Sequence, residues 1–160
     1  MDIKKHITAL GFVPKNGTNG IYHKIYVDYA IEIDFEKQSI NYGSGITADS
    51  KTTQNFSDAE NFVVLECVDR LLAKGYKPQN LILEKTWPSG HGTSGRLDIC
   101  VNREDGTPYM LIECKTYGKE YNKELARIRK DGGQLFTYFL SILMHTTLVH
   151  QPYHQIIGNK

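Results

Sequence analysis

Two alternating segments around an Asp-Gly dipeptide place the tightest constraint on how this chain folds. Residues 95–115 read GRLDICVNREDGTPYMLIECK, with apolar and polar residues alternating on both sides of Asp105-Gly106. Asp-Gly tolerates the positive φ angles of a tight two-residue turn, and alternation with period two is typical of a half-buried strand. The segment therefore predicts an antiparallel hairpin.

The position of the turn also fixes which residues of the hairpin lie opposite each other. Counting outward from Asp105-Gly106 sets Asp98 opposite Glu113, with Lys115 on the same face as Glu113. Side chains alternate between the two faces of a strand, so the other face is apolar throughout. That apolar face consists of Leu97, Ile99, Val101, Met110, Ile112 and Cys114. We expect it to face a hydrophobic core.

Two carboxylates held face to face repel each other unless a cation lies between them. Directly opposed residues have Cβ atoms about 4.5–5.5 Å apart, and this applies to Asp98 and Glu113. A divalent cation relieves the repulsion, and Mg²⁺ is the natural candidate because it prefers carboxylate and phosphate oxygens. The ammonium of Lys115 is then suited to orient an attacking water or to stabilise charge on a phosphate. The alternative is a solvated face whose carboxylates are neutralised by Arg96 and Lys115.

The N-terminal part of the chain has a different pattern from the rest. A short helix is expected at residues 3–10, then a glycine- and asparagine-rich break, and then three strands of an antiparallel meander. The polar segment ADSKTTQN reads as a linker. We expect an antiparallel β appendage ahead of the core.

The central part combines helices and strands. Ser57 to Glu60 has the spacing of a capping box, so a helix is expected from Ser57 to a stop at Gly75. A core strand is expected at residues 80–87, before the hairpin. The fold predicted is α/β, with a mixed β-sheet core flanked by helices. The chain is expected to divide into a β-rich appendage at residues 1–56, a core domain at 57–145 and a tail at 146–160.

A basic stripe follows the hairpin. Lys119, Lys123, Arg127 and Lys130 recur at helical spacing in TYGKEYNKELARIRKDGG, and Gly132-Gly133 ends the segment. Such a stripe is suited to contact with DNA phosphates. The alternative is a solvated helix face whose charge is relieved by neighbouring glutamates.

Composition narrows the range of functions. The chain has 160 residues and a formal net charge of +1, which argues against a protein that coats DNA by charge alone. Three cysteines without CxxC spacing, and the lack of a signal sequence or a membrane-length apolar run, indicate reduced thiols and a cytoplasmic protein with no membrane partner. The sequence also lacks a Walker-type GxxxxGK[ST] motif, so it predicts no motor.

Asp98 followed by Glu113-Cys114-Lys115 resembles the D…ExK core of the PD-(D/E)xK nuclease superfamily. Gln134 and Tyr138 in GGQLFTYF resemble the QxxxY element of its RecB-like branch. The nearest resemblance is to the N-terminal nuclease domain of type I restriction enzyme R subunits, over roughly residues 1–139. It implies a restriction-endonuclease-like core.

The resemblance also implies roles for individual residues. Asp98 and Glu113 would bind Mg²⁺, or Mn²⁺ in its place, and Lys115 would assist the attacking water. Gln134 and Tyr138 would position the DNA backbone and the lysine. The implied partners are double-stranded DNA and a translocase domain or restriction-modification subunits outside this chain.

Two further acidic residues are candidate metal ligands. The resemblance suggests an acid on the first core helix, and Glu66 is the residue carried over; the alternative is an ordinary ion pair between Glu66 and Arg70. Glu84, on the strand expected at residues 80–87, is the other candidate. Which face Glu84 occupies depends on a strand register that the sequence does not give.

The expected function is therefore a metal-dependent DNA endonuclease of restriction type. Two alternatives stay open: a DNA-binding or assembly module that keeps the nuclease fold without cutting, and a stand-alone repair or junction nuclease.

Overall fold

Short alternating strands and tight turns fold the N-terminal third into an antiparallel sheet. In the computed structural model, which describes residues 2–88 and 94–133, helix α1 (Ile3–Ala9) precedes four strands in the spatial order β1-β2-β3-β4. Their bounds are β1 Val13–Pro14, β2 Ile21–Tyr26, β3 Tyr29–Asp34 and β4 Ser39–Asn41. The expected short helix and three-stranded meander are confirmed.

A second sheet is mixed and contains the hairpin. Its order is β5-β6-β7-β8, with β5 parallel to β6 and the other pairs antiparallel. The strands are β5 Thr47–Ala48, β6 Leu81–Pro88, β7 Ser94–Asn102 and β8 Pro108–Ile112, and a 3₁₀ turn, η1 (Pro78–Asn80), leads into β6. The expected mixed sheet is confirmed, and it contains one more short strand, β5, which the sequence pattern does not indicate.

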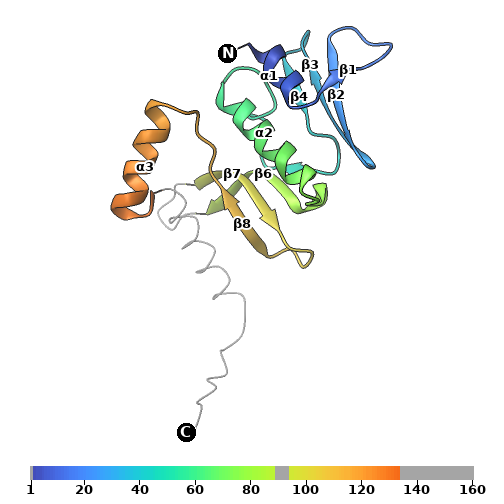
Figure 1. The fold of residues 1–160 in the computed structure, drawn as a ribbon. Coiled ribbons are helices and arrows are strands. Elements are labelled where there is room, and N and C mark those ends of the chain that lie inside the picture. Colours follow the sequence, from blue (N-terminus) through green and yellow to red (C-terminus); the bar gives the residue numbers. More distant parts are fainter. Residues whose placement is uncertain (1, 89–93, 134–160) are drawn as a thin grey trace.

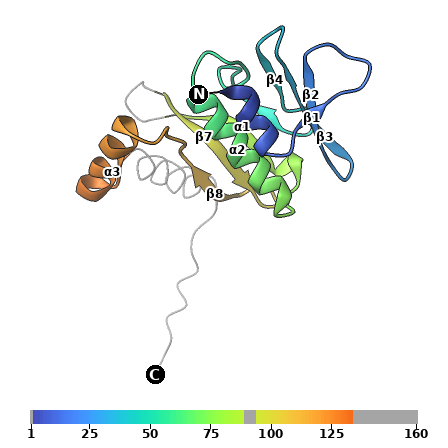
Figure 2. The ribbon, with the colours of Figure 1, turned by 45° about the horizontal axis from the view of Figure 1, so that its top comes forward.

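Helix α2 (Glu60–Ala73) joins the two sheets into one core. It lies between them in Figures 1 and 2, and residues of both sheets belong to one hydrophobic cluster with its buried side chains. Phe62 is 2 % exposed and packs its ring against Phe56 at 5.2 Å between centroids. The described residues thus form a mixed α/β structure with two sheets and three α-helices.

The ends of α2 test the capping prediction. The helix begins at Glu60 with Ala59 as N-cap and no side-chain cap, while the hydroxyl of Ser57 donates to the side chain of Asn55. The expected capping box is therefore wrong. The expected stop is confirmed, because Gly75 has a φ of +88° and its N–H donates to Leu72.

The hairpin has the predicted register near the core and a different turn. Ile99 pairs with Ile112 and Val101 with Met110, as expected from the sequence. The two-residue turn is wrong: the N–H of Gly106 donates to Arg103 and only Gly106 has a positive φ, +82°. A type I turn followed by a glycine bulge shifts the register between Val101 and Asn102.

Side-chain alternation along β7 changes phase at the level of Asp98. Ile99 and Val101 belong to the main core, but Leu97 packs with Cys100 in a second cluster on the other face. On the neighbouring strand, Glu84 lies between the pairs that flank Asp98 and has a φ of +52°. This irregular backbone turns Asp98 toward α2, so the prediction that Leu97 shares a face with Ile99 is wrong.

A buried polar contact ties the first sheet to α2. Asp69 is 6 % exposed and accepts hydrogen bonds of 2.5 Å from both Lys24 and Tyr26 of β2. Burial and the carboxylate of Asp69 raise the pKa of Tyr26, so the phenol stays a donor.

We expect Asp69→Ala to lower the free energy of unfolding by about 3 kcal/mol, because it leaves the ammonium of Lys24 partly buried without its counter-charge. Asp69→Asn keeps an acceptor and should cost less. Urea denaturation of the three proteins measures both effects, and equal stability of Asp69→Ala and wild type would contradict the assigned role.

The last described element carries the basic stripe. Helix α3 runs from Lys119 to Asp131 and ends at Gly132, whose φ is +82°, as the Gly132-Gly133 break predicted. Among the described helices, none combines the length and apolar character needed to cross a membrane.

Candidate active site

The strand ladder of the hairpin ends where the candidate site begins. β8 stops at Ile112, and Asp98 of β7 accepts a 2.6 Å hydrogen bond from the backbone N–H of Cys114 through Oδ2. A side chain thus replaces the backbone pairing expected between Asp98 and Glu113. The contact holds the Glu113-Cys114-Lys115 segment beside Asp98.

Lys115 is surrounded by oxygen atoms. Its Nζ lies 2.7 Å from Oε1 of Glu113, 3.2 Å from Oε1 of Glu60 and 2.9 Å from the carbonyl oxygen of Cys114. The Lys115 side chain is 20 % exposed, so these contacts are largely shielded from solvent. Asp98, Glu113 and Lys115 therefore lie close together, and Glu60 joins them from α2.

The electrostatics of this cluster are unusual for a protein surface. Burial, together with the charge of Asp98, raises the pKa of Glu113 to about 7, although Lys115 acts in the opposite direction. Burial also raises the pKa of Asp98, against the effect of the Cys114 N–H and of Lys115. For Lys115, burial acts to lower the pKa, but Glu113 and the other carboxylates outweigh it and the net pKa is raised.

The two oxygens of the Glu113 carboxylate have different surroundings in the described structure. The Glu113 side chain is 6 % exposed, and Oε2 is buried without a partner among the described residues. An unsatisfied buried carboxylate oxygen is costly and calls for a cation or a water. Across residues 2–88 and 94–133, however, no group of three or more His, Cys, Asp or Glu side chains is arranged to hold a metal ion.

Glu84 lies next to the cluster but is held by the protein. It is 1 % exposed, and Thr52 donates to it through both the backbone N–H and the hydroxyl. Arg96 lies 3.6 Å from its Oε1. Glu84, Asp98 and Glu60 line one polar pocket of about 200 Å³. The segment read as a polar linker is thus a packed support for Glu84, and the role of Glu84 as a second ligand stays a prediction.

Glu66 and Glu60 are both on α2 but contact different residues. Glu66 forms the alternative ion pair with Arg70 at 2.5 Å and lies 3.8 Å from His6, so it is not brought to Lys115. The acid that α2 brings to Lys115 is Glu60, which the sequence suggested only as part of a capping box. No local sequence signal distinguishes Glu60 from Glu66 for this contact, because it depends on how α2 packs against the end of β8.

The remaining predicted site residues divide into two groups. Lys119, Lys123, Arg127 and Lys130 are all exposed on α3, with Arg127 3.5 Å from Glu124. Gln134, Tyr138 and the tail at residues 146–160 lie outside the described residues, so their expected roles stay predictions.

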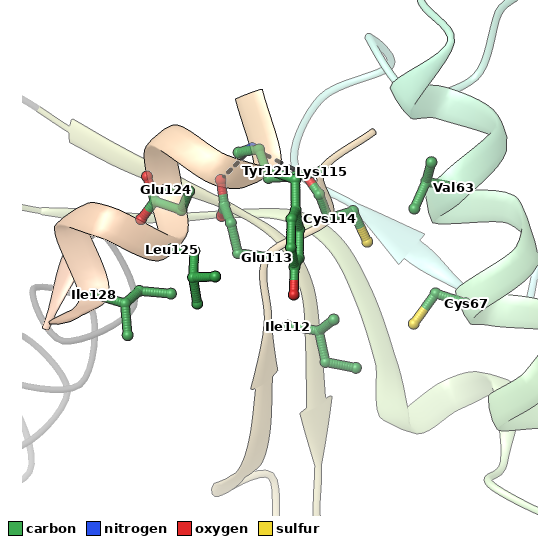
Figure 3. Close-up of a pocket in the computed structure, with 10 residues that line it drawn as sticks. All are labelled: Val63, Cys67, Ile112, Glu113, Cys114, Lys115, Tyr121, Glu124, Leu125 and Ile128. Atoms are coloured by element: carbon green, nitrogen blue, oxygen red, sulfur yellow. Dashed lines mark hydrogen bonds and ion pairs between the residues drawn. The ribbon is translucent and has the colours of Figure 1, made fainter. Parts of the chain in front are cut away.

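An apolar pocket of about 380 Å³ adjoins Glu113 and Lys115. Figure 3 shows that side chains of α3, namely Tyr121, Leu125 and Ile128, face it together with Ile112 of β8. Val63 and Cys67 of α2 and Cys114 complete its apolar wall, and Glu124 adds a carboxylate. The charged cluster thus lies at the edge of a hollow between α2, α3 and the end of β8.

Comparison with family models, curated proteins and solved structures gives no match to this chain.

Proposed function

We propose that this protein is a metal-dependent DNA endonuclease with a restriction-endonuclease-like core, formed by the β5–β8 sheet, α2 and α3. One observation carries the proposal. Two carboxylates with raised pKa values, Asp98 and Glu113, share a buried site with the ammonium of Lys115. Strongly perturbed groups gathered beside a pocket are typical of catalytic sites.

The residues of the cluster fit a divalent cation. Glu113 offers a buried oxygen that has no partner within the described part of the chain, and Asp98 adds a second carboxylate beside it. Carboxylate oxygens are the hard ligands that Mg²⁺ or Mn²⁺ prefers. A cation bound there would stabilise negative charge on a phosphate. It would also lower the pKa of Glu113 and so favour the ionised carboxylate.

The other groups would prepare the site for phosphodiester hydrolysis. Since its pKa is raised, Lys115 stays protonated near neutral pH and acts as a hydrogen-bond donor to the phosphate or to the attacking water, not as a base. Glu60 orients the ammonium of Lys115, and Asp98 fixes the segment through the Cys114 N–H. Gln134 and Tyr138 are proposed to support the lysine and the DNA backbone.

The exposed positive charge of α3 supports a nucleic-acid substrate. The exposed basic residues of α3 begin four residues after Lys115, which suits phosphates on either side of the bond to be cut. We propose double-stranded DNA as substrate, in the cytoplasm. In a restriction system, a translocase domain or modification subunits outside this chain would deliver it.

Incubation of supercoiled plasmid with the purified protein tests this function. Nicked or linear DNA should appear with Mg²⁺ or Mn²⁺ and should be absent with EDTA. Failure to cut at any protein concentration with either metal would reject the endonuclease.

The pKa of Glu113 predicts a pH profile. A carboxylate must be ionised to bind a cation, and the pKa of Glu113 is raised to about 7. At limiting Mg²⁺, we therefore expect the cleavage rate to rise about tenfold per pH unit below pH 7 and to level off above it. Initial rates from pH 5.5 to 8.5 provide the measurement, and a flat profile would contradict the assignment of Glu113.

A second candidate is a DNA-binding or assembly module that keeps this fold without cutting. One observation favours it: Lys115 already forms ion pairs with both Glu113 and Glu60. DNA binding that persists when the plasmid is never cut would select this module. If the protein does cut, comparing plasmid, flap and four-way substrates separates a restriction-type enzyme from a repair or junction nuclease.

A further inference from the structure

The apolar pocket beside Glu113 and Lys115 is larger than the proposed chemistry needs. Phosphodiester hydrolysis requires oxygen ligands, a cation and a water, and none of these uses an apolar wall. At about 380 Å³, the pocket falls in the range of about 300–1,000 Å³ typical of sites for small organic groups. The size and apolar lining of the pocket suit an apolar group that is flat or compact.

The rim of the pocket is aromatic. Tyr121 lines the pocket and is 43 % exposed, and its ring lies 6.0 Å from that of Tyr117, which is 94 % exposed. Proteins that bind single-stranded nucleic acid use exposed aromatic side chains as platforms on which bases stack. Tyr109, at 55 % exposed, provides a contrast, because its ring packs against Tyr76 and Arg103 at the far end of β8.

Charge around the pocket restricts the occupant further. Lys115 lies at one edge of the pocket and contacts Glu113, and the carboxylate of Glu124 also lines the pocket. Lys119 and Lys123 are two residues before and after Tyr121, so they lie on the opposite face of α3. A phosphate held at Lys115 would bring the base attached to it over the neighbouring Tyr121. Aromatic rings beside phosphate-binding side chains are a usual arrangement for binding single-stranded nucleic acid, whose bases are not hidden in a duplex.

We infer that this pocket holds an unpaired nucleobase next to the phosphate bound at Glu113 and Lys115. The preferred substrate is then DNA with an unpaired nucleotide at the bond to be cut, such as a gap edge, a bulge or a splayed end. This inference rests on the proposed function for the position of the phosphate. The binding of the base itself needs no cleavage.

Duplexes that carry the fluorescent base 2-aminopurine test the inference. One duplex has a single bulged 2-aminopurine and the other has the same base fully paired, and both are titrated with the protein in EDTA. We expect the bulged duplex to bind about tenfold more tightly and its 2-aminopurine emission to be quenched on stacking against Tyr121. Equal affinity for the two duplexes with unchanged emission would overturn the inference.

Matched tyrosine variants locate the effect. Tyr121→Ala should weaken binding of the bulged duplex by about tenfold to a hundredfold and abolish the quenching, with little change for the paired duplex. Tyr121→Phe should behave as wild type, and so should the control Tyr109→Ala. Tyr117→Ala, which removes an almost fully exposed side chain, should weaken the same binding severalfold without disturbing the fold. Equal losses from Tyr121→Ala and Tyr109→Ala would count against the pocket.

Failure of this inference is distinguishable from failure of the nuclease. Quenching of bulged 2-aminopurine without plasmid cleavage would support the base-binding site and reject the proposed nuclease activity. Metal-dependent plasmid cleavage with no discrimination between the duplexes would support the nuclease and overturn the base site.

Discussion

Lys115→Ala is expected to lower the rate of plasmid cleavage by at least about a hundredfold, the usual effect of removing one donor from a charge-stabilising site. The Nζ of Lys115 lies 2.7 Å from Glu113 and 3.2 Å from Glu60. Its removal therefore leaves both carboxylates without the ammonium that pairs with them. The pKa of Glu113, already raised to about 7, should then rise further and the carboxylate should be less ionised at neutral pH. Initial cleavage rates at saturating Mg²⁺ measure the loss.

Controls separate this loss from unfolding. Lys74→Ala removes an exposed lysine at the end of α2 and should cut as wild type. The circular dichroism spectrum of Lys115→Ala should match that of the folded wild-type protein. Cleavage by a folded Lys115→Ala protein at the wild-type rate would show that the lysine has no catalytic role.

Phe62→Ala is expected to lower the free energy of unfolding by about 3–5 kcal/mol, because it opens a cavity in a core that cannot fully collapse. Phe62 is 2 % exposed and packs against Phe56 and His6, which precede α2 in the chain. Since α2 lies between the two sheets, we expect both sheets to unfold together in one transition.

The single tryptophan makes this measurable. Trp87 is in β6, so its fluorescence reports on the second sheet, while far-ultraviolet circular dichroism reports on the whole chain. In urea, the two signals should coincide for wild type and for Phe62→Ala. Ile25→Ala, at a residue 65 % exposed on β2, should change stability little. Two separate transitions would contradict a shared core.

The hairpin was largely predictable from the sequence because its information is local. Alternation and a turn signal fix a register within a few residues, and the pairs from Ile99↔Ile112 to Val101↔Met110 agree with it. The turn type was not predictable at the same level. A type I turn with a glycine bulge and a two-residue turn both accept Asp105-Gly106, and they differ by one residue in loop length.

The missed features depend on distant contacts. The positive φ of Glu84 is disfavoured locally and persists because Thr52, 32 residues earlier, holds its carboxylate. The choice between Glu60 and Glu66 depends on how α2 is rotated against the end of β8. Helical periodicity gives the apolar stripe of α2, but not which acid beside the stripe contacts Lys115.

Binding of Mn²⁺, followed by electron paramagnetic resonance, tests most directly whether Asp98 and Glu113 share a cation. The free ion gives a sharp spectrum that disappears on binding, so no DNA or cleavage is needed. We predict that the wild-type protein binds Mn²⁺ and that Asp98→Asn and Glu113→Gln each weaken the binding at least tenfold while remaining folded. Unchanged Mn²⁺ binding in both variants, or no binding by the wild-type protein at millimolar Mn²⁺, would contradict the account.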